Sequence, residues 1–524
     1  MTATLDPATD AGLAGAAEAV AVTARCVDLA FPAVTGQGTE FAVAESAMDA
    51  VTVDALIRDA RAAHGDVAVQ QAQAARLLAA TAAERAVSTL RQVGGETTEP
   101  AASAARLAVH PTPIHQVRSA IGAAVHAGRF QYDATTLPLP PELVSLRALV
   151  RRFVTEQLLP HEARLNEDGD LPVELWAELE RRGRELDLNA LGLPAEHGGM
   201  GLGLVGQLVA AEEMGRVAVG FRHVVGTPPG SLPLARHGTA AQHAAYLRPW
   251  LRGERWGAWA TTEPEAGSDL AAIRTVAVRD GDGWRIDGAK HFITGLDRAD
   301  FVITFAKTDP DRGLKGLTAF LVDLDAPGVE VGREQHMMGR EGLHSFELRY
   351  DGLHVGDDAR LGEPDEGFRL LIADVSRMRV LMAGHCLGVA ARLIDIAADW
   401  GRGRVQFGRP IGEFEALQWY LADSAAELLA CRSSAYRTAM AIDAGQRAQA
   451  ESATVKAYGT ELACRVADRA MQILGGTGYC TELPVEALYR AVRLWRIAEG
   501  SSEIQRMLVG RQLAAGWRPE VGVA

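Results

Sequence analysis

The sequence contains only five cysteines, at the widely spaced positions Cys26, Cys386, Cys431, Cys464 and Cys480. None of them forms a Cys-x-x-Cys pair, and none stands at a metal-ligand spacing from a histidine. An odd and scattered set of cysteines argues against a disulfide framework and for a reducing compartment. We therefore expect no metal site and a cytoplasmic protein.

Positive charge is also in short supply, since the formal net charge is −14. Nucleic-acid binding draws on clustered Lys and Arg, so the balance of charge excludes it as an expected role. The N-terminus carries Asp6 and Asp10 where a signal peptide would be basic, and the apolar stretch 11–24 is too short for a bilayer. We expect no membrane span.

The hydrophobic share of 48% in 524 residues indicates several globular units, and the pattern divides the chain into four parts. Residues 1–137 are rich in alanine, with helices expected at 53–63 and 67–92, and are interpreted as a peripheral helical appendage of unknown role. Residues 138–258 show helical spacing, which begins after a proline-rich boundary with Pro141 at a first helical position.

At Trp259 the spacing changes to short extended runs, separated by turns such as Asp280-Gly281-Asp282-Gly283. Residues 259–366 are therefore expected to form a small β domain. Helical spacing returns over 367–524 with breaks that leave about four long helices, the pattern of a four-helix bundle. The predicted fold is α+β and mostly helical.

Two glycine-rich stretches have the letters of nucleotide-binding loops without their context. Residues 201–206 read GLGLVG, yet no strand is expected before them and no acid follows at the required distance. Residues 472–479 read QILGGTGY and follow a helix, so a C-cap accounts for Gly475 and Gly476. We expect neither a Rossmann site nor a phosphate loop.

Two further stretches are open to a functional or a local reading. TTEPEAGSDL, residues 261–270, is either a polar interdomain loop or part of a ligand site. RVQFGRPI, residues 404–411, carries arginines that either interact with the negative end of the helix dipole or bind a phosphate group. Taken alone, this stretch is better explained by the interaction with the helix dipole.

Near the C-terminus the chain reads RIAEGSSEIQR, residues 496–506. A capping box of the S-x-x-Q form over Ser502 to Gln505 accounts for Glu503 and Gln505. It does not account for Glu499, which follows Ile497 and Ala498. A carboxylate in apolar surroundings has a raised pKa and suits a general base.

Together, TEPEAGSD, FITG, RVQFGRP, QILGGTGY and AEGSSEIQR resemble, in order, the motifs of the acyl-CoA dehydrogenase family. The resemblance covers about residues 138–517 and implies a helical domain, a central β-barrel domain and a C-terminal four-helix bundle. It also implies FAD-dependent α,β-dehydrogenation of an acyl-CoA, with Glu499 as the base that takes the α proton. An alternative base position on an earlier helix corresponds to Met378, which cannot accept a proton.

The resemblance further implies the residues that contact FAD. Those expected at the flavin ring are Trp259, Thr261, Thr262, Ser268, Phe292, Thr294, Ser501 and Glu503. Those expected at the adenosine and pyrophosphate, some across a subunit interface, are Arg404, Phe407, Gln472 and Gly476. Departures from the family pattern stand at Glu415, Gly295 and Ala498.

The partners implied are an electron-transferring flavoprotein and further copies of the chain, in a homotetramer or homodimer. An acyl-CoA oxidase, or a dehydrogenase of carrier-bound acyl groups, is the alternative activity. A third alternative is a flavin-fold protein that binds without turnover, which the acidic charge and the intact Glu499 disfavour.

Overall fold

The computed structural model describes residues 7–30, 36–93, 113–132 and 139–519. The chain forms two compact units. The first comprises Met1–Ser145, Ala211–Arg216 and Arg379–Ala524, and the second comprises Leu146–Ala210 and Val217–Met378. The helices that contribute residues to both are α6 (Pro141–Phe153), α9 (Leu204–Met214) and α13 (Gly367–Gly403). The boundary predicted at residue 138 lies outside the described residues.

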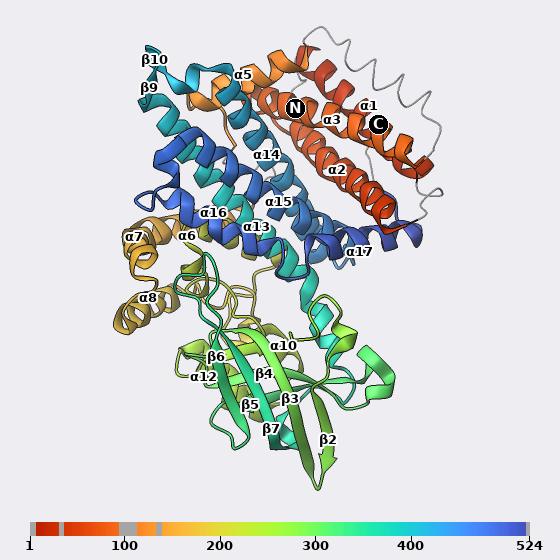
Figure 1. The fold of residues 1–524 in the computed structure, drawn as a ribbon, viewed down its shortest axis with the longest axis vertical. Helices are drawn as coiled ribbons and strands as arrows, with labels where there is room; N and C mark the ends of the chain where they lie inside the picture. Colours follow the sequence, from red (N-terminus) through yellow and green to blue (C-terminus); the bar gives the residue numbers. More distant parts are fainter. Residues whose placement is uncertain (1–6, 31–35, 94–112, 133–138, 520–524) are drawn as a thin grey trace. The chain divides into compact units, whose positions relative to one another are not determined.

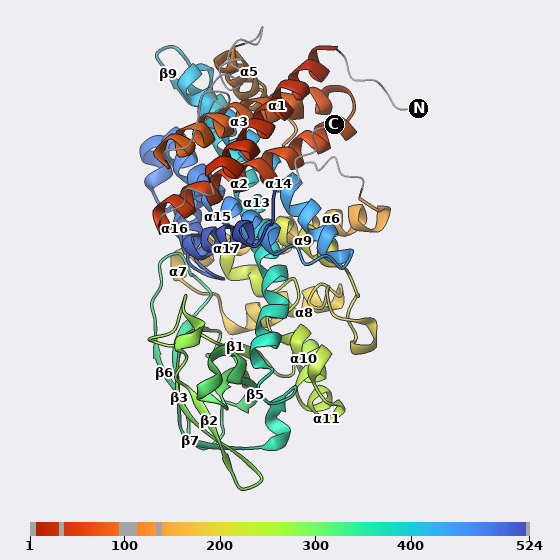
Figure 2. The ribbon, with the colours of Figure 1, turned by 90° about the vertical axis from the view of Figure 1, so that its right-hand side faces the viewer.

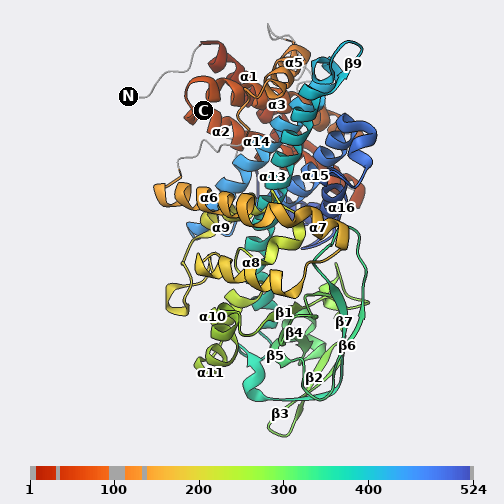
Figure 3. The same ribbon diagram turned by 90° about the vertical axis from the view of Figure 1, so that its left-hand side faces the viewer.

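The second unit begins with the helical region expected from the sequence (Figure 3). Its remaining α-helices are α7 (Leu159–Asp168), α8 (Val173–Glu185), α10 (Ser231–His237), α11 (Ala240–Gln242) and α12 (Arg248–Arg252). The stretch GLGLVG leads into α9, which begins at Leu204, and the residues before it, 195–203, form a short 3₁₀ turn and loop without a strand. The expectation that no strand precedes this stretch is therefore confirmed.

An eight-stranded sheet forms the rest of the second unit (Figure 1). The strands are β1 (Gly257–Ala260), β2 (Val276–Asp280), β3 (Gly283–Thr294), β4 (Phe301–Lys307), β5 (Leu317–Asp323), β6 (Val329–Glu334), β7 (Ser345–Gly356) and β8 (Arg360–Leu361). Their order is β6-β7-β3-β2-β4-β5-β8, with β1 parallel to β4. The predicted β domain is present as this sheet, with β6 and β8 at its two ends. Asp280 pairs with Gly283, as the predicted turn requires.

Both faces of the central strands are buried because their side chains alternate between two cores. Along β4, Phe301 and Ile303 join a core that includes Trp250 of α12, whereas Val302 joins the opposite core. Residues of a strand point alternately to the two faces of a sheet, so a run of apolar residues buries both. The sheet is thus a rigid scaffold for the loops at its edges.

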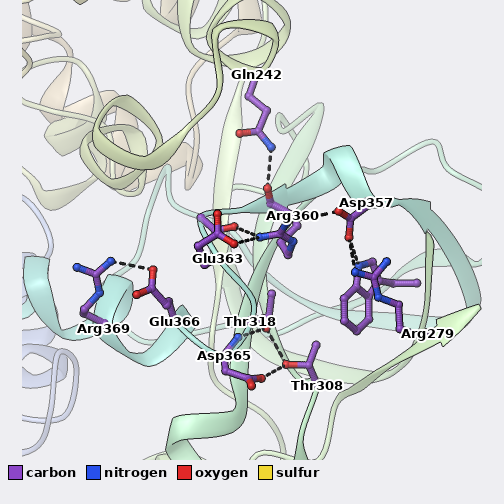
Figure 4. A network of polar contacts seen from close by, with 12 residues as sticks. Gln242, Arg279, Thr308, Thr318, Asp357, Arg360, Glu363, Asp365, Glu366 and Arg369 are labelled. Carbon is purple, nitrogen blue, oxygen red and sulfur yellow. Dashed lines mark hydrogen bonds and ion pairs between the residues drawn. The ribbon is translucent and has the colours of Figure 1, made fainter. Parts of the chain in front are cut away.

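Polar contacts fix the segment that leaves the sheet toward α13 (Figure 4). Gln242 Nε2 donates to the carbonyl oxygens of Asp358 and Arg360, at 2.7 and 2.9 Å. Thr308 Oγ1 donates to Asp365 Oδ1 at 2.7 Å, and the Asp365 amide donates to Thr318 Oγ1 at 2.8 Å. Buried polar groups with partners of this kind hold a loop in one conformation.

Where the structure describes it, the first unit is helical apart from one short hairpin (Figures 1 and 2). Besides the shared helices, its elements are α1 (Pro7–Ala30), α2 (Gln37–Ala62), α3 (Gly65–Gln92), α5 (Ile114–His126), β9 (Val405–Gln406), β10 (Arg409–Pro410), α14 (Glu415–Asp443), α15 (Gln449–Leu474), α16 (Pro484–Trp495) and α17 (Ser502–Ala514). The helices α13, α14 and α15 meet closely at Gly459, where an added Cβ would lie 3.3 Å from Ala383 and 3.4 Å from Cys431 Sγ. The predicted C-terminal bundle is confirmed.

The two helices expected in the appendage are confirmed as parts of α2 and α3, while α1 was not predicted. The three pack on one another, α2 also packs on α14 and α17, and α5 packs on α14. Alanines such as Ala47, Ala60 and Ala75 are fully buried, because small side chains let helices approach closely. The appendage is therefore continuous with the bundle core of the first unit.

Among the described residues one helix, α13, is long and apolar enough to cross a membrane, and 72% of its apolar window is buried in the protein. The core helix of a globular protein meets the same criterion.

Candidate active site

Glu499 lies in the loop between α16 and α17, in a backbone conformation that side chains rarely adopt. Its φ is +55°, and that of Gly500 is +84°. The left-handed region is unfavourable for a residue with a Cβ, so the surroundings must hold Glu499 in place. Ser501 ends the loop as the N-cap of α17, with its Oγ accepting from the Ile504 amide at 3.4 Å. The Ser502 amide donates back to the Arg496 carbonyl at 2.9 Å.

Gln505 is the side chain that holds this loop from α17. Its Nε2 donates to the carbonyl oxygens of Gly500, at 2.9 Å, and Glu499, at 3.3 Å. The predicted capping box was therefore wrong by one residue. Ser501 is the cap in place of Ser502, and Gln505 binds loop carbonyls instead of an N-cap amide. Either of the two serines can serve as an N-cap, and the S-x-x-Q spacing pointed to Ser502. In the structure α17 begins one residue earlier, after the left-handed Glu499 and Gly500.

Two cations on neighbouring helices, the buried Lys456 and the partly buried Arg379, interact with the charge of Glu499. Lys456 of α15 is 0% exposed, and its Nζ donates to the Gly500 carbonyl at 2.6 Å. Burial lowers the pKa of Lys456 to about 8, while the negative charge of Glu499 opposes that shift. Burial also lowers the pKa of Arg379 on α13 to about 10, again opposed by Glu499. The carboxylate of Glu499 is thus close enough to both cations to change their protonation.

Sequence reasoning did not identify these supporting residues. Lys456 stands between Val455 and Ala457, both at most 1% exposed, and a lysine inside such a helical stripe was the available signal. Arg379 directly follows Met378, the position considered and rejected as a base. Neither contact can be read from spacing alone, because each joins helices far apart in the chain.

The second unit gathers six of the residues expected at the flavin ring. Trp259 lies on β1 and packs on Phe305, with ring centroids 4.9 Å apart. The Thr262 carbonyl accepts from the His291 amide at 2.8 Å, which brings the 261–270 loop beside β3. The members placed there on β1, this loop and β3 are Trp259, Thr261, Thr262, Ser268, Phe292 and Thr294. Phe292 is 52% exposed and has a φ of +58°.

Glu263 in the same loop has a structural role that its motif does not reveal. It pairs with the buried Lys290 of β3 at 2.8 Å, and accepts from the amides of Arg274, at 2.5 Å, and Thr275, at 3.1 Å. Burial raises the pKa of Glu263, but Lys290 and these hydrogen bonds outweigh it and hold that pKa below its usual value. The Glu263 carboxylate therefore stabilises the conformation of the 261–270 loop.

The residues expected at the adenosine and pyrophosphate lie elsewhere in the first unit. The residues after α13 form the hairpin β9–β10, whose two-residue turn, Phe407-Gly408, has φ values of +49° and +79°. Phe407 is 94% exposed at its tip. Gln472 and Gly476 lie at the C-terminal end of α15, where Gly475 forms the predicted cap with a φ of +61°. The hairpin lies at the far end of the bundle from α17, so one copy of the chain does not bring the hairpin to that helix (Figures 1 and 2).

No group of three or more metal-ligating side chains occurs within the described residues. The first unit holds a candidate carboxylate with two neighbouring cations, and the second unit separately holds a set of hydroxyl and aromatic side chains.

Comparisons with known proteins identify the family. Models of the acyl-CoA dehydrogenase N-terminal, middle and C-terminal domains match residues 140–254, 258–353 and 365–514. An acyl-CoA dehydrogenase of Bacillus subtilis (strain 168) is 33% identical over 377 residues, which cover 72% of this chain and 98% of that protein. The chain belongs to the acyl-CoA dehydrogenase family. Residues 1–130 match no family model.

Solved structures agree with this assignment. Butyryl-CoA dehydrogenase from Megasphaera elsdenii is 28% identical with a TM-score of 0.66, over 72% of this chain and 99% of that one. The FAD complex of PigA is 26% identical with a TM-score of 0.67, over 73% and 100%. The protein is therefore a flavoenzyme of acyl-CoA metabolism, with FAD as its cofactor.

The residues of the second unit fit such a cofactor. Thr261 Oγ1 is buried and has no hydrogen-bond partner within the described part of the chain. A buried hydroxyl without a partner is costly, so a bound group that supplies one would be favoured there. The exposed Phe292 on β3 offers an aromatic surface for a planar ring.

Proposed function

We propose that Glu499 is the base that removes the α proton of an acyl-CoA thioester during α,β-dehydrogenation. The observation that carries this proposal is the loop itself. Its carbonyls are held by Gln505 and Lys456, and its half-buried carboxylate faces Lys456 and Arg379. A carboxylate that is held in one place and kept ionised is suited to proton transfer.

In this reaction the Cα–H bond breaks as its proton passes to a Glu499 oxygen, which becomes a carboxylic acid. The Cβ–H bond breaks with its electron pair, and the Cα–Cβ double bond forms. Bound FAD supplies the hydride acceptor, at flavin N5. We propose that the Glu499 amide donates to the thioester oxygen, where negative charge develops. Trp259, Thr261, Thr262, Ser268, Phe292, Thr294, Ser501 and Glu503 would hold the flavin in place.

We further propose that Arg404, Phe407, Gln472 and Gly476 contact the adenosine and pyrophosphate of FAD across a subunit interface. The distance of the β9–β10 hairpin from the Glu499 loop supports this proposal. A homodimer or homotetramer, an electron-transferring flavoprotein as electron acceptor and a cytoplasmic location complete the proposed role. Family resemblance supports the first two of these, and the scattered cysteines support the third.

The experiment is an anaerobic titration of the holoenzyme with a panel of acyl-CoAs, following the flavin absorbance, on wild type and Glu499→Gln. Wild type should bleach with one class of acyl chain. The variant should keep its flavin but react about 10³-fold more slowly, because an amide cannot accept the α proton. Glu84→Gln on an exposed face of α3 is the matched control and should bleach normally.

Full turnover by Glu499→Gln would show that Glu499 is not the base. A wild-type flavin that no acyl-CoA bleaches would instead favour a carrier-bound substrate or binding without turnover. Rapid reoxidation of the reduced flavin by O2 would identify the oxidase alternative.

A further inference from the structure

Lys456 is a buried ammonium whose position the proposed reaction does not explain. It lies on α15 among fully buried side chains, and its Nζ donates to the Gly500 carbonyl at 2.6 Å. A buried charge is costly unless it is paired, and one carbonyl oxygen is a weak partner for an ammonium group. The negative charge that completes its surroundings lies one residue earlier, on Glu499.

The charged and titratable groups near this pair come from two helices, α13 and α15. Arg379 and Cys386 face it from α13, and Glu461 lies one turn further along α15. Within the described residues Arg379 Nε has no hydrogen-bond partner. Both cations interact with the charge of the Glu499 carboxylate, and Lys456 also holds the loop through its hydrogen bond to the Gly500 carbonyl.

We propose that Lys456 is a positioning residue that keeps Glu499 ionised and its loop in the left-handed conformation. This inference rests on the proposed function, since it concerns the same base. A neighbouring positive charge favours the carboxylate over the carboxylic acid, so it lowers the pKa of the base. Without Lys456, Glu499 would be protonated at a higher pH, and a larger share of the enzyme would lack its base.

The test is the pH dependence of kcat/KM for Lys456→Met and Lys456→Gln holoenzymes. Methionine removes the charge and the hydrogen bond, whereas glutamine keeps a donor for the Gly500 carbonyl and removes only the charge. In both variants the pH at which kcat/KM falls on the acid side should be higher by about one unit. At pH values well below that point, this shift is about a tenfold loss of kcat/KM. Toward high pH the rates should approach that of wild type, and Lys456→Arg should restore the limb.

Lys315→Met is the control, because Lys315 is exposed in the 3₁₀ segment Pro310–Gly316 and belongs to none of the segments assigned to FAD or to the base. Its acid limb should be that of wild type. Flavin content and unfolding temperature show whether each variant is folded, and the glutamine variant decides alone if the methionine variant is not.

An unchanged acid limb in the folded variants, or a loss that is equal at every pH, would overturn the inference and leave the proposed function intact. Glu499→Gln, measured in the same series, separates the two. If that variant keeps its turnover, the base assignment fails, and the role of Lys456 fails with it.

Discussion

Arg506 of α17 and Glu45 of α2 form an ion pair, with 2.8 Å between Nε and Oε1. The same guanidinium lies 3.6 Å from Glu461 of α15, whose carboxylate also pairs with Arg496 at 2.9 Å. Two arginines that share one carboxylate thus flank the loop of Glu499, and the appendage contacts one of them. This part of the chain, although it matches no family model, belongs to the packing around the candidate base.

Removing residues 1–137 should therefore damage the enzyme. The truncated chain would expose the faces of α14 and α17 that α2 and α5 cover, and would leave Arg506 without Glu45. We expect the unfolding temperature to fall by about 5 °C or more, because buried apolar area returns to water. Differential scanning calorimetry and kcat measured on a chain beginning at Pro138 would check this. An unchanged unfolding temperature and kcat would show that the appendage is peripheral, as the sequence predicted.

Gln505→Leu should weaken catalysis more than substrate binding. The side chain is 0% exposed and holds the carbonyls of Glu499 and Gly500, so its loss frees the loop while the helix remains. A misplaced base costs rate in the proton transfer, and we expect kcat to fall about tenfold with little change in KM. Steady-state kinetics would measure both. Gln512→Leu, one to two turns along α17, is the control and should leave kcat unchanged.

Glu263→Gln should destabilise the fold by about 3 kcal/mol, because it leaves the Lys290 ammonium buried without a counter-ion. Burial already lowers the pKa of Lys290 to about 8, and the loss of Glu263 lowers it further. The unfolded chain then binds the proton more tightly than the folded one, so stability of the variant rises with pH. The deficit relative to wild type should be largest at mildly acid pH, where wild-type Glu263 is ionised and Lys290 is protonated, and should shrink toward about pH 8.

Thermal unfolding of both proteins across this pH range would measure the deficit. Glu265→Gln is the matched control, since Glu265 is exposed in the same loop and lies 3.9 Å from the exposed Arg274. Its change should stay within about 0.5 kcal/mol. A deficit for Glu263→Gln that is the same at every pH would contradict the role given to Lys290.

The sequence predicts most of the fold because the spacing of its large apolar side chains distinguishes helices from strands. The change from helical spacing to short strands at Trp259 and the turn at Gly281 both correspond to what the structure contains. The helix α1 was missed because alanines stand on its exposed face, at Ala11 and Ala14, as well as on its buried face, at Ala16 and Ala19, which leaves little contrast between the two.

Glu499 could be singled out by its neighbours in the chain. Lys456 and Arg379 could not, because helix packing alone brings them to it. The chain has four lysines among 53 basic residues, so a lysine on the inner face of α15 is unusual. The sequence shows that this lysine is rare, but it does not show which group the lysine contacts.

Phe407→Ala should weaken assembly and flavin retention while leaving the fold of one chain intact. Phe407 is 94% exposed at the tip of the β9–β10 hairpin, where only Phe414 contacts its ring among the aromatic residues described, with centroids 6.0 Å apart. An exposed aromatic side chain in a left-handed conformation gains little from its own chain, and aromatic residues are typical anchors of subunit interfaces. We expect the unfolding free energy of the single chain to change by about 0.5 kcal/mol or less, with a smaller mean oligomer and less bound FAD. Sedimentation velocity and the flavin-to-protein absorbance ratio would measure these.

Val173→Ala, which shortens the exposed first residue of α8, is the control for removing exposed apolar surface and should change neither. If Phe407→Ala keeps the oligomer and the FAD content of wild type, the hairpin does not serve a neighbouring subunit, and the proposed contacts across the interface are withdrawn.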